Sequence, residues 1–208
     1  MPLVRKPGGN PPSTATAAGA ALGKRASVHA DERWAAARAA ADVPGSTTAL
    51  AGALRHEGDP RVREAMFTSL ALIGTRESAD EVISFLRSDS ANLRAGALDA
   101  LRTMTGNMRE LLPRLLGDRD ADIRILSCEL TRNLPGPDAT TLLCSLLADE
   151  HEANVCAAAI DVLAEVGGPA ALPTLAECAV RFRDSPFLTF AIRTATDRIN
   201  SQHPPSRA

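Results

Sequence analysis

Asp59-Pro60-Arg61-Val62-Arg63 is a five-residue phrase that returns four more times along this chain. The later copies are Ser90-Ala91-Asn92-Leu93-Arg94, Asp120-Ala121-Asp122-Ile123-Arg124, Glu152-Ala153-Asn154-Val155-Cys156 and Asp184-Ser185-Pro186-Phe187-Leu188. The apolar fourth residue recurs after 31, 30, 32 and 32 residues. A nearly constant period of this size is typical of a solenoid, in which each repeat buries its apolar face against its neighbours. The phrase therefore predicts a repeat architecture.

Each phrase opens a stretch that is rich in alanine and leucine, which both favour helices. Asp59 and Asp120 are suitable N-cap residues, because a carboxylate accepts hydrogen bonds from the free amides of a first turn. Trp34 would fill the apolar anchor position of an additional first repeat. We expect the first helices of the repeats over residues 32–42, 60–74, 91–104, 121–133, 153–166 and 186–199.

A second pattern, two apolar pairs separated by two residues, predicts a second helix in each repeat. Leu111-Leu112-x-x-Leu115-Leu116 and Leu142-Leu143-x-x-Leu146-Leu147 are its best copies, and the four positions cover one broad helix face. Aromatic residues make up only 3% of the chain, and no alternating run indicates a strand. The sequence thus predicts an all-α fold, a right-handed α-solenoid of about five helix pairs plus a closing half-repeat. Glycines are expected to end the helical segments in left-handed conformations, namely Gly74, Gly106, Gly136 and the pair Gly167-Gly168.

Charge and composition divide the chain into three segments. Residues 1–29 carry four basic and no acidic side chains before Asp31, and we expect a disordered basic tail there, with the repeats over 30–200 and a second disordered tail over 201–208. Between 31 and 200, 18 basic residues face 25 acidic ones, a charge of the wrong sign for neutralising phosphates. We therefore expect no nucleic acid partner, and the possibility of a DNA-lesion binder is disfavoured.

The remaining composition indicates a cytoplasmic protein. No run approaches the roughly 18 apolar residues of a membrane span, and the four cysteines form no C-x-x-C pair, so they are expected to be reduced and mostly buried. Cys144 is the one that the helix face count places outward. We expect the chain to be a monomer outside its complex with a partner.

These residues carry a resemblance to a known family. An Asp-Pro-x-Val-Arg phrase that opens an alanine- and leucine-rich helix, followed by a phrase such as Ala171-Leu172-Pro173-Thr174-Leu175, resembles the HEAT-like repeat, particularly the bacterial class named after phycobilisome lyases. The resemblance implies an α-solenoid. It leaves the function open, because similar repeats occur in scaffolds, lyase subunits, hydroxylases and DNA-repair glycosylases.

The resemblance also implies a structural role for the repeated arginines. In similar repeats an arginine at this place pairs with an aspartate of a neighbouring turn. We therefore expect Arg63, Arg94 and Arg124 to form a ladder, and a row of ligand-binding arginines is the alternative. The aspartates suitably placed for the pairing are Asp59, Asp89 and Asp120.

Two His-Glu pairs raise the question of a metal centre. Similar hydroxylases hold a di-iron site with several such pairs, but here only His56-Glu57 and His151-Glu152 occur, 95 residues apart. We expect both pairs to be solvated turn residues, with no metal and no cofactor. The main enzymatic alternative is an accessory subunit of a bilin lyase, against which the scarcity of aromatic residues counts.

The exposed face of the second helices is the candidate site. Its residues are mostly small, so the face could accept a partner helix or extended segment, or could merely permit tight curvature. We expect a non-catalytic protein-interaction adaptor or scaffold whose groove binds another protein. The predicted groove residues are Glu81, Ser84, Phe85, Glu110, Arg114, Thr141 and Ser145.

Overall fold

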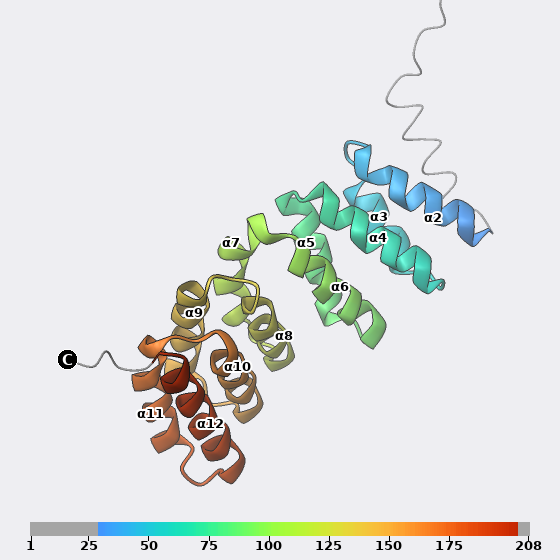
Figure 1. Ribbon diagram of the computed structural model, residues 1–208. Coiled ribbons are helices and arrows are strands. Elements are labelled where there is room, and N and C mark those ends of the chain that lie inside the picture. The colour runs from blue at the N-terminus through green and yellow to red at the C-terminus, as the bar shows by residue number, and fades with distance from the viewer. Residues whose placement is uncertain (1–28, 204–208) are drawn as a thin grey trace, which may run out of the picture. The chain divides into compact units, whose positions relative to one another are not determined.

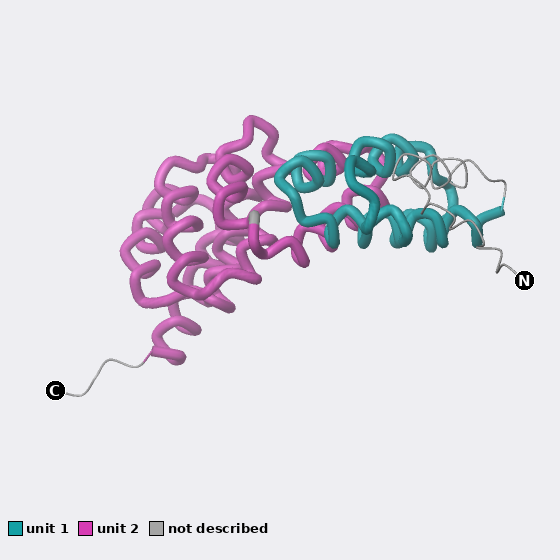
Figure 2. Tube along the Cα trace, turned by 90° about the horizontal axis from the view of Figure 1, so that it is seen from above, with its two compact units in different colours: residues 1–82 teal, residues 83–208 magenta. Residues whose placement is uncertain are grey.

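The computed structural model describes residues 29–203, all of which lie in helices, turns or connecting segments. The chain forms two compact units, one ending at Val82 and one beginning at Ile83 (Figure 2). The predicted tail 1–29 lies outside the described residues except for His29. The predicted C-terminal tail begins too early, because Ser201 and Gln202 still belong to the last helix.

The first unit contains two helix pairs. α2 packs against α4, the next first helix, and α3 also packs against α4. The elements are α2 (Ala30–Ala39), the 3₁₀ helix η1 (Ala40–Asp42), α3 (Thr47–Leu54), α4 (Pro60–Ile73) and α5 (Arg76–Ser84), whose last two residues cross into the second unit.

The second unit contains three further pairs and a closing helix. Its first helices α8, α10 and α12 lie side by side (Figure 1), with α10 packed between the other two. The predicted all-α fold of helix pairs with a closing half-repeat is confirmed. The elements are η2 (Phe85–Arg87), α6 (Ala91–Thr103), α7 (Thr105–Leu116), α8 (Ala121–Thr131), α9 (Gly136–Asp149), α10 (Ala153–Val166), η3 (Pro169–Ala171), α11 (Leu172–Arg181) and α12 (Pro186–Gln202).

The predicted N-caps are present, whereas only one predicted glycine turn is left-handed. An Asp59 carboxylate oxygen accepts from the amides of Arg61 at 2.9 Å and Val62 at 3.4 Å, and Asp120 accepts from Asp122 at 3.0 Å. Gly74 ends α4 with a φ of 61°. Gly106 and Gly136 lie inside helices, so the prediction is wrong for them. Gly167 ends α10 as predicted, but Gly167 and Gly168 have negative φ rather than the left-handed conformation.

The repeat register needs two corrections. In the last phrase, Ser185 is the N-cap, so the buried anchor is Leu188, and Phe187 is 66% exposed. In the first repeat, α2 begins after His29 and Trp34 is 42% exposed rather than an anchor. In both repeats the position of the N-cap, rather than the nearest large apolar residue, determines which side chain faces the core.

Candidate protein-interaction surface

The structure distributes the predicted groove residues between both units. Four lie on the second helices of the second unit and are exposed, namely Glu110 and Arg114 on α7 and Thr141 and Ser145 on α9. Two lie at the end of α5, where Glu81 and Ser84 are half-buried, and a terminal nitrogen of Arg55 on α3 donates to Glu81 at 3.2 Å.

Phe85 is not part of this surface, and its assignment to the groove was wrong. Its side chain is only 2% exposed. The face count assumed a continuous α-helix, but after Ser84 the chain tightens into the 3₁₀ helix η2. A tighter winding of three residues per turn rotates each following side chain relative to an α-helix, so Phe85 joins the core.

The exposed face between α7 and α9 is hollowed at its C-terminal end. At the other end, Arg109 of α7 forms an ion pair with Asp138 of α9. Beyond that pair lies a cleft of about 430 Å³, which we call the α7–α9 cleft. It is lined by Pro113, Leu116, Gly117, Asp118, Arg124, Leu142, Ser145, Leu146, Asp149 and Glu150.

The α7–α9 cleft combines an apolar floor with an available carboxylate. Leu142 and Leu146 are only half-buried, so apolar surface faces the cleft. The exposed Asp149 at its rim makes no ion pair or side-chain hydrogen bond with the described residues. A cleft of this composition favours a ligand that carries an apolar group next to a cation.

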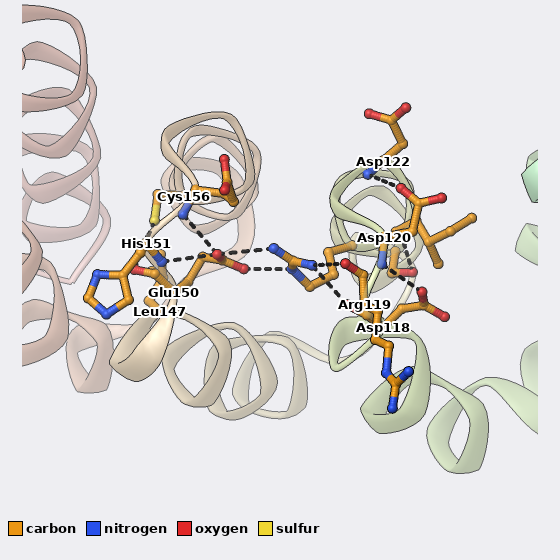
Figure 3. Close-up of polar contacts among 12 residues, drawn as sticks. Asp118, Arg119, Asp120, Asp122, Leu147, Glu150, His151 and Cys156 are labelled. Atoms are coloured by element: carbon orange, nitrogen blue, oxygen red, sulfur yellow. Dashed lines mark hydrogen bonds and ion pairs between the residues drawn. The ribbon is translucent and has the colours of Figure 1, made fainter.

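The wall of the cleft is fixed by a buried ion pair. Nε and a terminal nitrogen of Arg124 donate to the two carboxylate oxygens of Glu150 at 2.7 and 3.2 Å, and the two side chains are 13% and 7% exposed. Glu150 also accepts from the backbone amides of His151 and Glu152 at 3.0 and 2.9 Å (Figure 3). Burial opposes the ionisation of Glu150, but these donors outweigh it and hold the pKa of this carboxyl below its usual range.

The ladder arginines bind backbone rather than the predicted aspartate side chains. Each lies four residues after its N-cap, and one terminal nitrogen donates to the carbonyls five and six residues before it. The first arginine of the ladder, which the sequence analysis missed, is Arg33, four residues after the N-cap His29. Arg33 binds both carboxylate oxygens of Glu57 at 2.8 and 2.9 Å. The carbonyl acceptors are Glu57 and Gly58 for Arg63, Ser88 and Asp89 for Arg94, and Asp118 and Arg119 for Arg124.

The His-Glu pairs also differ from expectation. His56 and His151 are exposed, but Glu57 is not a solvated turn residue, because its side chain is 5% exposed and bound to Arg33. Among residues 29–203, no three side chains of His, Cys, Asp or Glu come together as they would have to for a metal ion.

One repeat lacks the ladder arginine and receives another from its own second helix. Cys156 of α10 stands at the ladder position, and its thiol lies 3.7 Å from the Glu150 carbonyl. Arg181, at the end of α11, donates to that carbonyl at 2.8 Å and to Leu147 at 2.7 Å and Ala148 at 2.5 Å. Arg181 therefore supplies the cation that Cys156 cannot, at a helix C-terminus where a cation is favourable.

We expect Arg181→Ala to lower the free energy of unfolding by about 1.5 kcal/mol, because three carbonyls lose a charged donor. Chemical unfolding followed by circular dichroism measures the change. Arg183→Ala is the matched control, since Arg183 is 78% exposed and its contact with Asp184 is on the surface, and it should change the stability little. Equal effects of the two substitutions would contradict the compensating role of Arg181.

The cysteines do not add a reactive centre to the cleft. Burial raises the pKa of the Cys128 and Cys156 thiols to about 12, and burial also raises the pKa of Cys144 and Cys178. Because the thiolate is the reactive form, these thiols are poor nucleophiles. None of the helices between residues 29 and 203 is both long and apolar enough to span a bilayer.

A comparison with known protein families also finds repeats in this chain. Residues 108–188 match the model of HEAT repeats. The resemblance to HEAT-like repeat proteins is confirmed. This segment holds α8, α9, α10, η3 and α11, most of α7 and the start of α12, and therefore includes the α7–α9 cleft. No curated protein matches the chain.

Solved structures with similar folds are distant in sequence. An archaeal HEAT-like repeat protein from Thermococcus onnurineus NA1 is 16% identical with a TM-score of 0.47, over 90% of this chain and 88% of that one. The complex of CpcE and CpcF of phycocyanin lyase from Nostoc sp. PCC7120 is 15% identical with a TM-score of 0.37, over 97% and 99%. A designed armadillo repeat protein is 16% identical with a TM-score of 0.39, over 87% and 99%.

Proposed function

We propose that this chain is a non-catalytic protein-interaction scaffold that binds a segment of a partner protein in the α7–α9 cleft. The observation that carries the proposal is the combination of half-buried Leu142 and Leu146 with the unpaired carboxylate of Asp149 in one cleft. The partner segment would place an apolar side chain between the two helices and a lysine or arginine beside Asp149. Glu110, Arg114, Thr141 and Ser145 would contact the flanking residues.

The rigidity of the cleft wall supports this role. Arg124 donates four hydrogen bonds, two to the Glu150 carboxylate and two to backbone carbonyls. Two backbone amides donate to Glu150 as well. A preformed wall loses little conformational freedom on binding, so more of the interaction free energy remains as affinity. The bilin-lyase alternative has no comparable support, because the residues that line the α7–α9 cleft include no aromatic side chain.

We expect Ser145→Arg to weaken binding of the physiological partner at least about tenfold, because the long side chain fills the cleft and brings a second cation to Asp149. The partner is first identified by affinity capture and mass spectrometry, and its binding to each variant is then measured by titration calorimetry. Ala95→Arg, the same change of side chain at another exposed position, on α6, is the matched control and should bind normally. Undiminished affinity of Ser145→Arg would overturn the proposed site.

A further inference from the structure

A row of ion pairs joins consecutive first helices of the second unit. Arg102 of α6 lies 3.9 Å from Glu129 of α8, and Arg132 of α8 lies 2.6 Å from Asp161 of α10. In both pairs the arginine stands twelve residues after the N-cap of its own helix. The acid stands nine residues after the N-cap of the next first helix. Arg132 also pairs with Glu165. The charged row is therefore a register feature of the repeat.

The row stops between α10 and α12, and a hollow takes its place. The two register positions are occupied there by Ala164 and Thr194, neither of which carries a charge, so no ion pair can form. The hollow measures about 560 Å³ and is lined by both residues together with Glu165, Arg193, Asp197, Arg198, Ser201 and Gln202. We call it the α10–α12 hollow.

The charges that line the α10–α12 hollow are not balanced. Arg193 and Arg198 form no ion pair or hydrogen bond through their side chains with the residues that the structure describes. Glu165 is already bound to Arg132, so among residues 29–203 Asp197 supplies the one lining carboxylate without a partner. Two available guanidinium groups against one available carboxylate leave a site that favours an anionic group.

An apolar surface borders the same side of α12. Phe190 precedes Thr194 by four residues and Asp197 by seven, so the three lie on one helix face. Phe187 and Phe190 are 66% and 62% exposed, and because they stand three residues apart on one helix they form a contiguous apolar patch of the kind that marks interaction sites. The stripe along α12 therefore passes from apolar at its start to cationic at its end.

We propose that the α10–α12 hollow and the adjoining phenylalanines bind a partner segment that carries a glutamate or aspartate next to apolar side chains. The carboxylate would take the place of the missing ion pair and bind Arg193 and Arg198, while the apolar side chains cover Phe187 and Phe190. This surface is built from first helices, whereas the α7–α9 cleft lies mainly between second helices. The second unit therefore offers two separate sites of opposite charge preference.

The test uses the full chain and a displayed library of short random peptides, selected for binding and then measured one by one by fluorescence anisotropy. We expect a class of selected peptides in which acidic residues stand beside leucine or phenylalanine. These peptides should bind Arg193→Glu/Arg198→Glu at least about tenfold more weakly. Raising the salt concentration should also weaken them, because the contact is between exposed charges.

Two further variants make the result decisive. Thr194→Glu places a carboxylate four residues before Arg198, where the two can pair within the helix, and should also abolish binding while the helix stays folded. Arg76→Glu/Arg183→Glu makes the same change in net charge at exposed positions elsewhere and should bind normally, as should Ser145→Arg in the other site.

Three outcomes would overturn the proposal. The first is a selection without acidic peptides, and the second is acidic peptides whose affinity is indifferent to Thr194→Glu and Arg193→Glu/Arg198→Glu. The third is a mass that rises with concentration in sedimentation and falls back in Arg193→Glu/Arg198→Glu, which would assign the surface to a second copy of this chain.

Discussion

Replacing Arg124 with alanine should lower the free energy of unfolding by about 3 kcal/mol, because it leaves the buried Glu150 carboxylate without its partner. The Arg124 side chain is 13% exposed and contacts Glu150 from the following turn as well as two carbonyls of its own turn. It thus connects two consecutive repeats in addition to the apolar core. Chemical unfolding followed by circular dichroism at the helix signal measures the loss.

Arg87→Ala is the control for this prediction. Arg87 also pairs with a carboxylate, that of Asp118, but its side chain is 50% exposed. Solvent-exposed pairs contribute at most about 1 kcal/mol, so this variant should be much less destabilised. If Arg124→Ala cost no more than Arg87→Ala, the buried pair would not be a major source of stability.

The same ion pair makes stability depend on pH in a defined direction. The pKa of Glu150 is lower in the folded chain than in the unfolded chain, where it is about 4.3. Its contribution is therefore fully present above the unfolded-state pKa and is lost as the pH falls through the folded-state pKa. The stability difference between the wild type and Arg124→Ala should shrink on acidification below about pH 4.

The helices could be predicted from the sequence because the signals for them are local. The N-cap aspartates Asp59 and Asp120 and the leucine pairs of α7 and α9 depend on contacts within one helix or one repeat, so periodicity places them correctly. The exposed residues Glu110, Arg114, Thr141 and Ser145 follow from the same periodicity, since α7 and α9 are regular on that face.

The sequence did not reveal features that depend on how consecutive repeats meet. Phe85 was misplaced because a change of helix type has no clear sequence signature here. Glu57 was expected to be a solvated turn residue and the sequence did not single out Glu150, although both precede an N-cap by two residues and accept a hydrogen bond from the N-cap amide. Asp118 likewise accepts a hydrogen bond from the amide of the N-cap Asp120, at 2.9 Å. That repeated acid two residues before the N-cap is the signal that could have identified them.

The α7–α9 cleft illustrates the same limit of local patterns. Its position depends on Leu142 and Leu146 being only partly covered by α7, and a helix-face count assigns both to the core side. The count also gave no sign of the ion pair by which Arg109 and Asp138 join the two helices at one end. The opening at the other end exists because Pro113 and Gly117 offer no long side chain to fill it.

Gly167→Ala should be the second large perturbation, lowering the free energy of unfolding by about 2.5 kcal/mol through overpacking. Gly167 ends α10, and its amide donates to the Leu163 carbonyl at 2.9 Å. A Cβ built there would lie 2.4 Å from that carbonyl oxygen and 3.1 Å from the carbonyl carbon. The atoms in the way are backbone, so the end of α10 would have to shift, and thermal and chemical unfolding would both record the cost.

The adjacent residue provides the matched control, because a Cβ at Gly168 would meet nothing within 4 Å. Gly168 has a φ of −104°, which any residue can adopt, so alanine should be neutral or stabilise by up to about 1 kcal/mol by restricting the unfolded chain. The same substitution should therefore destabilise the chain at Gly167 but not at the neighbouring Gly168. Similar losses at both positions would mean that chain flexibility in this turn, rather than the approach of Gly167 to Leu163, requires glycine.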